Sequence, residues 1–129
     1  MLLRKYMSLI GIGSAKVDLI LEKDVYRAGD AVEGYFVITG GTISQQLKRI
    51  DCDLVMEELK TDKREVMDSV TILTKQSIQS GAETRIDFNF HIPKTASLST
   101  NSLQYHFHTI LNFDKGVQSV DHDVIRIVK

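Results

Sequence analysis

The stretch YRAGDAVEG, residues 26–34, brings together an aromatic residue, a Gly-Asp pair and a second glycine. A phosphate-binding loop would stand between a strand and a helix, where backbone N–H groups and the helix dipole meet the anion. Here the residues after Gly29 and Asp30 alternate between apolar and polar, which is typical of a strand. Gly29 can adopt a left-handed turn conformation, and Asp30 can hydrogen-bond to nearby backbone. We therefore interpret Tyr26, Gly29, Asp30 and Gly34 as a structural turn, in which Gly34 marks a bulge or a close approach of another segment.

Alternation of apolar and polar residues continues along most of the chain after residue 14. A period of two over segments of this length is typical of half-buried strands. Clusters of Gly, Asn, Asp and Ser separate the segments, and Pro93 closes one of them. Seven or more such strands predict an all-β, two-sheet antiparallel β-sandwich over residues 15–129. The clearest alternating segments are KVDLILEK (16–23), VEGYFVI (32–38), RIDCDLVMEE (49–58), RIDFNFHI (85–92) and LQYHFHTILN (103–112), with VIRIVK (124–129) at the end.

The composition is that of an ordinary globular chain. A length of 129 residues suits a single domain with a proper core. Basic and acidic residues nearly cancel, with a formal net charge of -1, so the charge gives no reason to expect a nucleic-acid partner. Cys52 is the only cysteine, which excludes an internal disulfide and fits a reducing compartment. Because no apolar run approaches the ~20 residues of a membrane span, we expect a cytoplasmic protein.

The N-terminal segment, residues 1–14, has a helical rather than a β period. Its apolar residues fall on one stripe, away from Arg4 and Lys5, and glycines at 11 and 13 would end the helix. We expect a short amphipathic helix that closes one end of the sandwich. The alternative is an element that contacts a partner protein or a membrane surface. The stripe consists of Leu2, Leu3, Tyr6, Leu9 and Ile10.

Two motifs carry a resemblance to a known family. The pattern Tyr-x-x-Gly-Asp-x-Val-x-Gly at residues 26–34 and the pattern Phe-x-Phe-x-Ile-Pro at residues 88–93 resemble those of arrestin-type β-sandwiches. More narrowly, residues 11–50 together with HTILNFDKGVQSVDHDVIRI (108–127) resemble the bacterial sporulation-control (SpoOM) proteins. The resemblance runs from Gly11 to Val128. It implies an arrestin-like cytoplasmic regulator, and it implies that the chain corresponds to the first of two sandwiches in tandem.

The candidate catalytic groups are one cysteine nucleophile and two sets of neighbouring carboxylates. Cys52 lies on the apolar face of its segment, where burial makes a thiol inert. Asp51 and Asp53 lie on the opposite face of the same segment, as on a solvated sheet surface. We interpret residues 121–123, Asp-His-Asp, as a turn into the last strand. Because no pocket that would shift pKa values is visible in the sequence, we expect no enzymatic activity.

Metal binding is the alternative function that the histidines suggest. His106 and His108 occupy alternate positions of one strand, so both imidazoles project from the same face. A third ligand could come from His91, His122, Asp121 or Asp123, and such a set would suit zinc or another transition metal. The simpler interpretation is an exposed polar strand face, in which case there is no cofactor.

The function expected from the sequence is a non-catalytic, regulatory protein–protein interaction. A β-sandwich offers open strand edges that can accept a strand from another chain. The expected partners are other proteins, with a homo-oligomer as one possibility. A metal- or small-ligand-binding sandwich centred on His106 and His108 is the second hypothesis.

Overall fold

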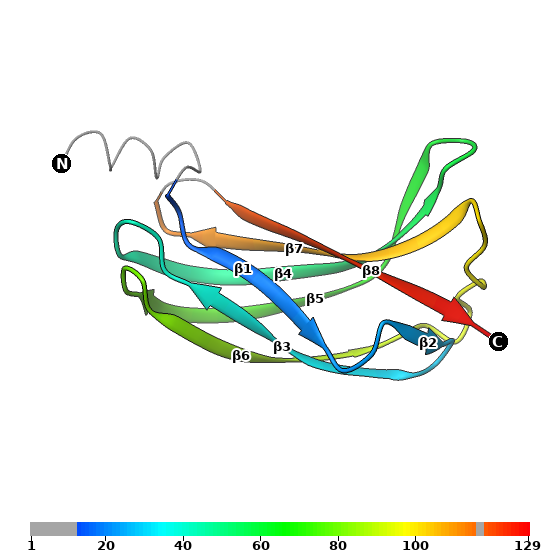
Figure 1. Ribbon diagram of the computed structural model, residues 1–129, viewed down its shortest axis with the longest axis horizontal. Coiled ribbons are helices and arrows are strands. Elements are labelled where there is room, and N and C mark those ends of the chain that lie inside the picture. The colour runs from blue at the N-terminus through cyan, green and yellow to red at the C-terminus, as the bar shows by residue number, and fades with distance from the viewer. Residues whose placement is uncertain (1–12, 116–117) are drawn as a thin grey trace.

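The computed structural model describes residues 13–115 and 118–129, and these form two packed β-sheets (Figure 1). The smaller sheet has the order β1-β3-β6, and the larger has the order β2-β8-β7-β4-β5. All neighbouring strands are antiparallel except β2 and β8. The all-β two-sheet sandwich predicted from the alternation is confirmed. The strands are β1 (Lys16–Leu21), β2 (Val25–Arg27), β3 (Ala31–Thr39), β4 (Gln45–Glu58), β5 (Lys63–Ile78), β6 (Glu83–His91), β7 (Leu103–Phe113) and β8 (Ser119–Val128).

The core lies between the two sheets and is built from the inward-facing residues of alternating strands. Phe88 of β6 makes an edge-to-face contact with Phe107 of β7, with ring centroids 5.4 Å apart, so this pair joins the two sheets. Phe36 of β3 also packs edge-to-face against Phe88, at 5.2 Å. Around the aromatic rings lie aliphatic side chains such as Ile50 and Leu54, both fully buried. Burial of this apolar surface is the dominant stabilising term of the fold.

The residues of the opening motif form the turn that the sequence predicted. Gly29 has a φ of +84°, and the carboxylate of Asp30 accepts a hydrogen bond from the backbone N–H of Arg27 at 2.8 Å. Gly34 lies in β3 opposite Leu21 of β1, in regular register, so it marks a close approach of backbone rather than a bulge. Tyr26 is buried, and its hydroxyl donates to the carbonyl of Lys23.

β2 departs from the antiparallel arrangement. After β1 the chain leaves the smaller sheet, pairs with β8 of the larger sheet over three residues, and then returns to form β3. Because β2 and β8 run in the same direction, this short pairing is parallel, with Tyr26 opposite Ile127. The first part of the chain therefore bridges both sheets on this side of the sandwich.

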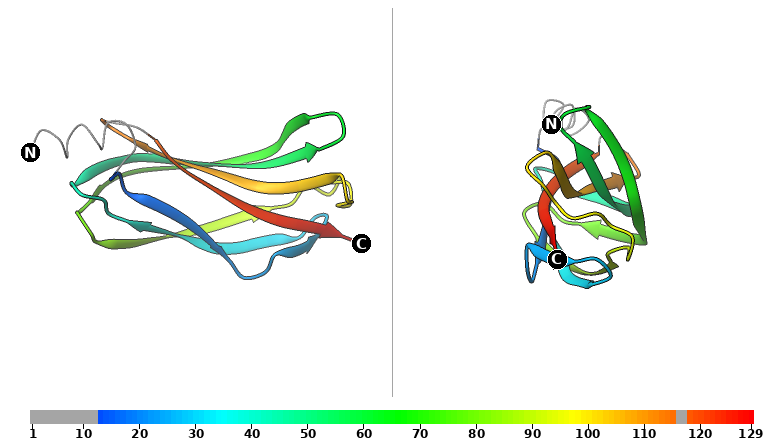
Figure 2. Two further views of the ribbon diagram at one scale, coloured as in Figure 1. Left: turned by 45° about the horizontal axis from the view of Figure 1, so that its top comes forward. Right: turned by 90° about the vertical axis from the view of Figure 1, so that its right-hand side faces the viewer.

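The hairpin of β4 and β5 is longer than the sequence indicated. The charged run KTDKRE at residues 60–65 has the composition of a solvated hairpin loop, but β5 begins at Lys63 and only residues 59–62 form the turn. Glu57 pairs with Arg64 and Glu58 with Lys63, and opposite charges across a ladder favour its extension. The tip of this hairpin rises away from the rest of the sandwich (Figure 1; Figure 2, left).

The predicted N-terminal helix and its apolar stripe, Leu2, Leu3, Tyr6, Leu9 and Ile10, lie outside the residues that the structure describes. Within the described ranges, no helix is long and apolar enough to cross a membrane.

Candidate functional site: three histidines on the outer face of the larger sheet

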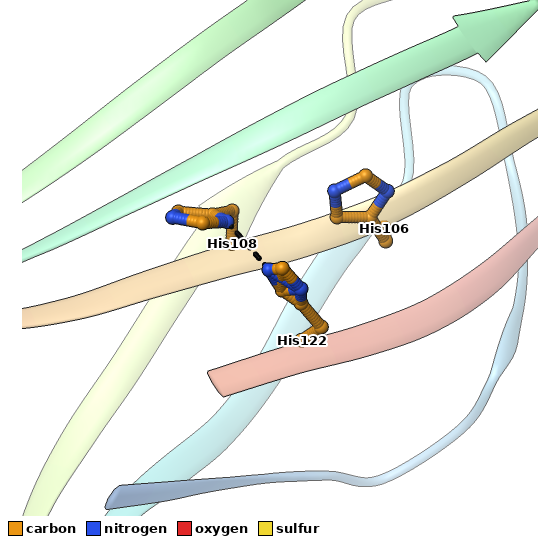
Figure 3. Close-up of side chains that lie close together, drawn as sticks. All are labelled: His106, His108 and His122. Atoms are coloured by element: carbon orange, nitrogen blue, oxygen red, sulfur yellow. Dashed lines mark hydrogen bonds between the residues drawn. The ribbon is translucent and has the colours of Figure 1, made fainter. Parts of the chain in front are cut away.

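The register of β7 and β8 brings three histidines together. Tyr105, Phe107 and Thr109 of β7 are buried in the core, so the alternate residues His106 and His108 project from the outer face of the sheet. β8 pairs antiparallel with β7, and His122 lies directly opposite His108. The three imidazoles therefore come from two neighbouring strands (Figure 3).

The imidazole rings are within coordination range of one another. The distance between His122 Nε2 and His108 Nδ1 is 2.8 Å, a hydrogen bond in which one ring donates and the other accepts. The ring centroid of His122 lies 4.4 Å from that of His108 and 5.2 Å from that of His106. One nitrogen from each of the three residues lies within 4.8 Å of the others. This is the arrangement that a shared ligand would require.

The environment of His106 and His108 lowers the pKa of both imidazoles. Burial lowers the pKa of His106, and the nearby His122 and the guanidinium of Arg64 lower it further. Burial and the proximity of His122 also lower the pKa of His108. The Nη2 of Arg64 lies 3.2 Å from the Nε2 of His106 and donates to it. Neutral imidazole, with a free lone pair, is the form that binds metals.

Of the four third-ligand candidates named from the sequence, the structure brings His122 to His106 and His108. His91 is the last residue of β6, in the other sheet. Asp121 and Asp123 lie opposite Thr109 and Phe107, so they share the inward face of β8 and point away from the histidines.

The interpretation of residues 121–123 as a turn was wrong. These residues lie inside β8, which runs from Ser119 to Val128. Their hydrophilic sequence resembles a turn, but the ladder with β7 holds them extended. The carboxylates then face the gap between β8 and the edge strand β1, where Asp121 Oδ2 accepts a hydrogen bond from the backbone N–H of Leu19 at 3.1 Å.

A group of carboxylates, Asp18, Asp121 and Asp123, forms at this edge. Among the described side chains, Asp123 has a buried oxygen, Oδ2, without a hydrogen-bond partner. Burial raises the pKa of Asp123 to about 8, and the neighbouring Asp121 and the charge of Asp18 act in the same direction. Asp123 therefore holds a proton more tightly than an ordinary carboxyl group.

The remaining catalytic candidates from the sequence, a cysteine and two carboxylates, are held by burial or by hydrogen bonds to neighbouring strands. Cys52 is fully buried, its Sγ accepts a hydrogen bond from the Thr109 hydroxyl, and burial raises its pKa to about 12. Asp53 accepts a hydrogen bond from Ser69 on the outer face. Burial acts to raise the pKa of Asp51, but hydrogen bonds from Arg49, Thr71 and Asn112 outweigh it and lower the pKa. A thiol with a raised pKa is a poor nucleophile.

Sequence reasoning missed Arg64 and Asp18 as neighbours of these clusters. Arg64 belongs to the charged run at residues 60–65, whose composition resembles that of a loop, and its strand pairing with Glu57 places it two strands from β7. The contact could have been found only by predicting that β5 begins at Lys63, within the charged run. Asp18 was visible as a polar residue of the first strand, but its approach to β8 depends on how the two sheets stack.

These features define an all-β sandwich whose outer face carries a histidine cluster, and comparison with known proteins gives its family. The family described as "SpoOM protein" matches residues 3–129, and the chain belongs to this family. It is 32% identical over 128 residues to the sporulation-control protein spo0M of Bacillus subtilis (strain 168), covering 95% of this chain and 50% of that protein.

A solved structure agrees with the fold. The crystal structure of Spo0M, the sporulation control protein from Bacillus subtilis, superimposes with a TM-score of 0.84 at 32% sequence identity, covering 92% of this chain and 51% of that one. The chain thus spans about half the length of the relatives it matches. The resemblance to the SpoOM proteins stated from the sequence motifs is confirmed.

Proposed function

We propose that the domain is a non-catalytic regulatory module that binds other proteins by accepting an extended segment along the open edge of β5. It would act in the cytoplasm, as an arrestin-like member of the sporulation-control family. Family membership supports the regulatory role. The exposed edge of β5 is the observation that carries the mode of binding.

β5 is a long strand at the end of the larger sheet. It spans 16 residues and, among the described strands, it is hydrogen-bonded to β4 alone. Its central stretch, residues 69–74 (SVTILT), carries no charge, although natural edges of this length are usually blocked by Lys, Pro or bulges. Register irregularities with β4 lie on both sides of this stretch, and between them the edge offers unpaired N–H and C=O groups to an added strand.

Exposed apolar side chains on β5 would add to such binding. Leu73 is 81% exposed and Val66 is 54% exposed. Leu73 also borders a surface depression together with Lys48 of β4 and Lys75 of β5. An incoming strand would pair with the backbone and could place apolar side chains beside Leu73, where burial of apolar surface is favourable.

Site-directed photo-crosslinking in bacterial cells tests this proposal. A photo-reactive residue replaces Thr71 on β5 or, as the control, Leu98, which is exposed in the segment between β6 and β7. We expect a specific adduct from position 71 but not from position 98. The substitution Leu73→Lys should abolish the adduct, since it places a charge on the edge, whereas Leu98→Lys should not.

Hydrogen exchange on the purified complex then locates the contact. Backbone amides of β5 should exchange more slowly when the partner is bound. If the added strand comes from a second copy, light scattering will report twice the mass of 14.6 kDa. Protection confined to other strands, or adducts that persist with Leu73→Lys, would contradict the proposal.

A further inference from the structure

The three-histidine cluster presents a set of ligand atoms suited to one metal ion. A tetrahedral ion bound at about 2.0–2.1 Å from each nitrogen needs nitrogens roughly 3.3 Å apart. The nitrogens of His106, His108 and His122 lie within 4.8 Å of one another, and those of His108 and His122 are already 2.8 Å apart. Small side-chain rotations therefore bring all three to coordinating distance, without movement of the strands.

The backbone holds these histidines in place. His108 and His122 are cross-strand partners in the β7–β8 ladder, and His106 is two residues along β7. His106 is 8% exposed, so its ring has little freedom to turn away. Sites on regular elements are held more precisely than sites on loops. The protein therefore holds the three histidines close together before any ion binds.

The chemistry of the donors selects the class of ion. Three imidazoles and no carboxylate suit zinc, nickel or copper, whereas magnesium and calcium prefer oxygen ligands. His122 is exposed, which leaves a coordination position facing solvent. Asp53 of β4 lies opposite His108, where its negative charge would favour a bound cation. Three protein ligands with an open fourth position are typical of an accessible rather than a closed structural zinc site.

We propose that His106, His108 and His122 form a binding site for a divalent transition-metal ion of the zinc, nickel and copper class, with a fourth position open to solvent. Binding requires one proton rearrangement. The proton now shared between His108 Nδ1 and His122 Nε2 moves to the remote nitrogen of the donating ring, so both facing nitrogens have lone pairs for the metal. None of the three ligands lies on β5, so this proposal does not rest on strand addition at the β5 edge.

The positive charge of Arg64 disfavours binding of a cation at the site, so the proposal predicts how a substitution of Arg64 changes the affinity. Its guanidinium donates to the Nε2 of His106 and brings a positive charge beside the bound ion. It belongs to the exposed start of β5, and the side chain must withdraw when His106 coordinates through Nε2. Removing this charge by Arg64→Gln should therefore raise the affinity for zinc. A surface on which metal binds non-specifically would not respond in this way.

Titration of the full chain with Zn²⁺ tests the site. Protein purified without a polyhistidine tag and freed of metal by chelation is titrated in a calorimeter, with Mg²⁺ as the control ion. We expect one saturable zinc site per chain and no magnesium binding. His108→Ala and His122→Ala should each weaken binding by more than about tenfold, since loss of an outer-shell partner alone costs about 10- to 100-fold.

The matched control is His91→Ala, which removes a histidine in the other sheet and should leave the affinity unchanged. Circular dichroism confirms that each variant remains folded. Lowering the pH should weaken binding, because protons compete for the imidazole nitrogens. Absence of saturable zinc binding, or a zinc affinity in the His108→Ala and His122→Ala variants equal to that of the native chain, would overturn the proposal.

Discussion

Gly34 occupies a position in β3 that has no space for a side chain. A β-carbon built there would lie 2.2 Å from the carbonyl oxygen of Ile20, an atom of the neighbouring strand β1. Backbone atoms of a paired strand cannot move aside without breaking the ladder. The glycine noted in the opening motif is thus a requirement of strand pairing, and the turn itself depends on Gly29.

Substitution of Gly34 by alanine should destabilise the domain by about 3 kcal/mol, the upper end of typical overpacking costs. Urea unfolding followed by circular dichroism measures the change in the free energy of unfolding. The control is Gly81→Ala, where nothing lies within 4 Å of the added carbon but φ is +73°. That variant should lose only about 1 kcal/mol, from backbone strain. Equal losses of unfolding free energy in Gly34→Ala and Gly81→Ala would contradict the conclusion that β1 leaves no space for a side chain at position 34.

Asp123 predicts a pH dependence of stability. Burial raises the pKa of its carboxyl group to about 8, above the ordinary value of 3.8, so the folded state binds this proton more tightly than the unfolded state does. Its contribution to stability is complete below about pH 4 and is lost as the pH rises towards 8. Asp123→Asn, which stays neutral, should remove this loss.

Thermal unfolding at a series of pH values measures the effect. Asp123→Asn should unfold at a higher temperature than the native chain at pH 8, and the difference should shrink towards pH 4. Glu33→Gln is the control, because Glu33 is an exposed carboxylate on β3. A parallel pH dependence in the native chain and in Asp123→Asn would rule out Asp123 as the source.

At the scale of the element, β2 shows how a very short strand can be fixed. It has three residues, and its parallel pairing with β8 is supported by a hydrogen bond from the N–H of Arg126 to the carbonyl of Asp24. Tyr26 supplies the anchor, since its ring is 2% exposed and its hydroxyl donates to the carbonyl of Lys23 at 2.8 Å.

Tyr26→Phe should cost about 1 kcal/mol in the free energy of unfolding, the usual value of one hydrogen bond, since the ring itself is retained. Tyr35→Phe is the matched control on β3, where the aromatic ring is half-buried and lies against Arg85. That change should stay within about 0.5 kcal/mol, as surface substitutions do. Chemical denaturation of both variants measures these changes in the free energy of unfolding. A neutral Tyr26→Phe would mean that the hydroxyl contributes nothing to the position of β2.

Sequence alternation was sufficient to predict the strands that have a clear period of two. It was insufficient for features that depend on which strands pair and in what register. The alternation predicted β3 and β7, and it placed His106 and His108 on one face. β2 has too few residues to show a period, and its parallel partner lies about a hundred positions away. The arrival of His122 beside His108 depends on the β7–β8 register, which the residues of that hairpin do not reveal. Asp121 and Asp123 were misread because carboxylates inside a strand resemble those of a turn.

For the whole molecule, the contacts between Phe88, Phe36 and Phe107 make the two sheets one unit. Phe88 is 1% exposed and packs against a ring of its own sheet and a ring of the other. Neither sheet alone can bury its apolar face, so each depends on the other. We therefore expect the described strands to unfold in a single cooperative transition, as is usual for domains of this size.

Phe88→Ala tests this coupling. Loss of the ring should cost about 3–5 kcal/mol through lost burial and the cavity left behind. If the sheets are one unit, the slowest-exchanging amides of β3 and of β7 should lose protection by the same amount, although the two strands lie in different sheets. Phe88→Leu provides a milder change should the alanine variant fail to fold, and it must shift both sheets equally. Loss of protection confined to β3 and β6 would instead show that the smaller sheet opens on its own, and the larger sheet would then persist without its apolar cover.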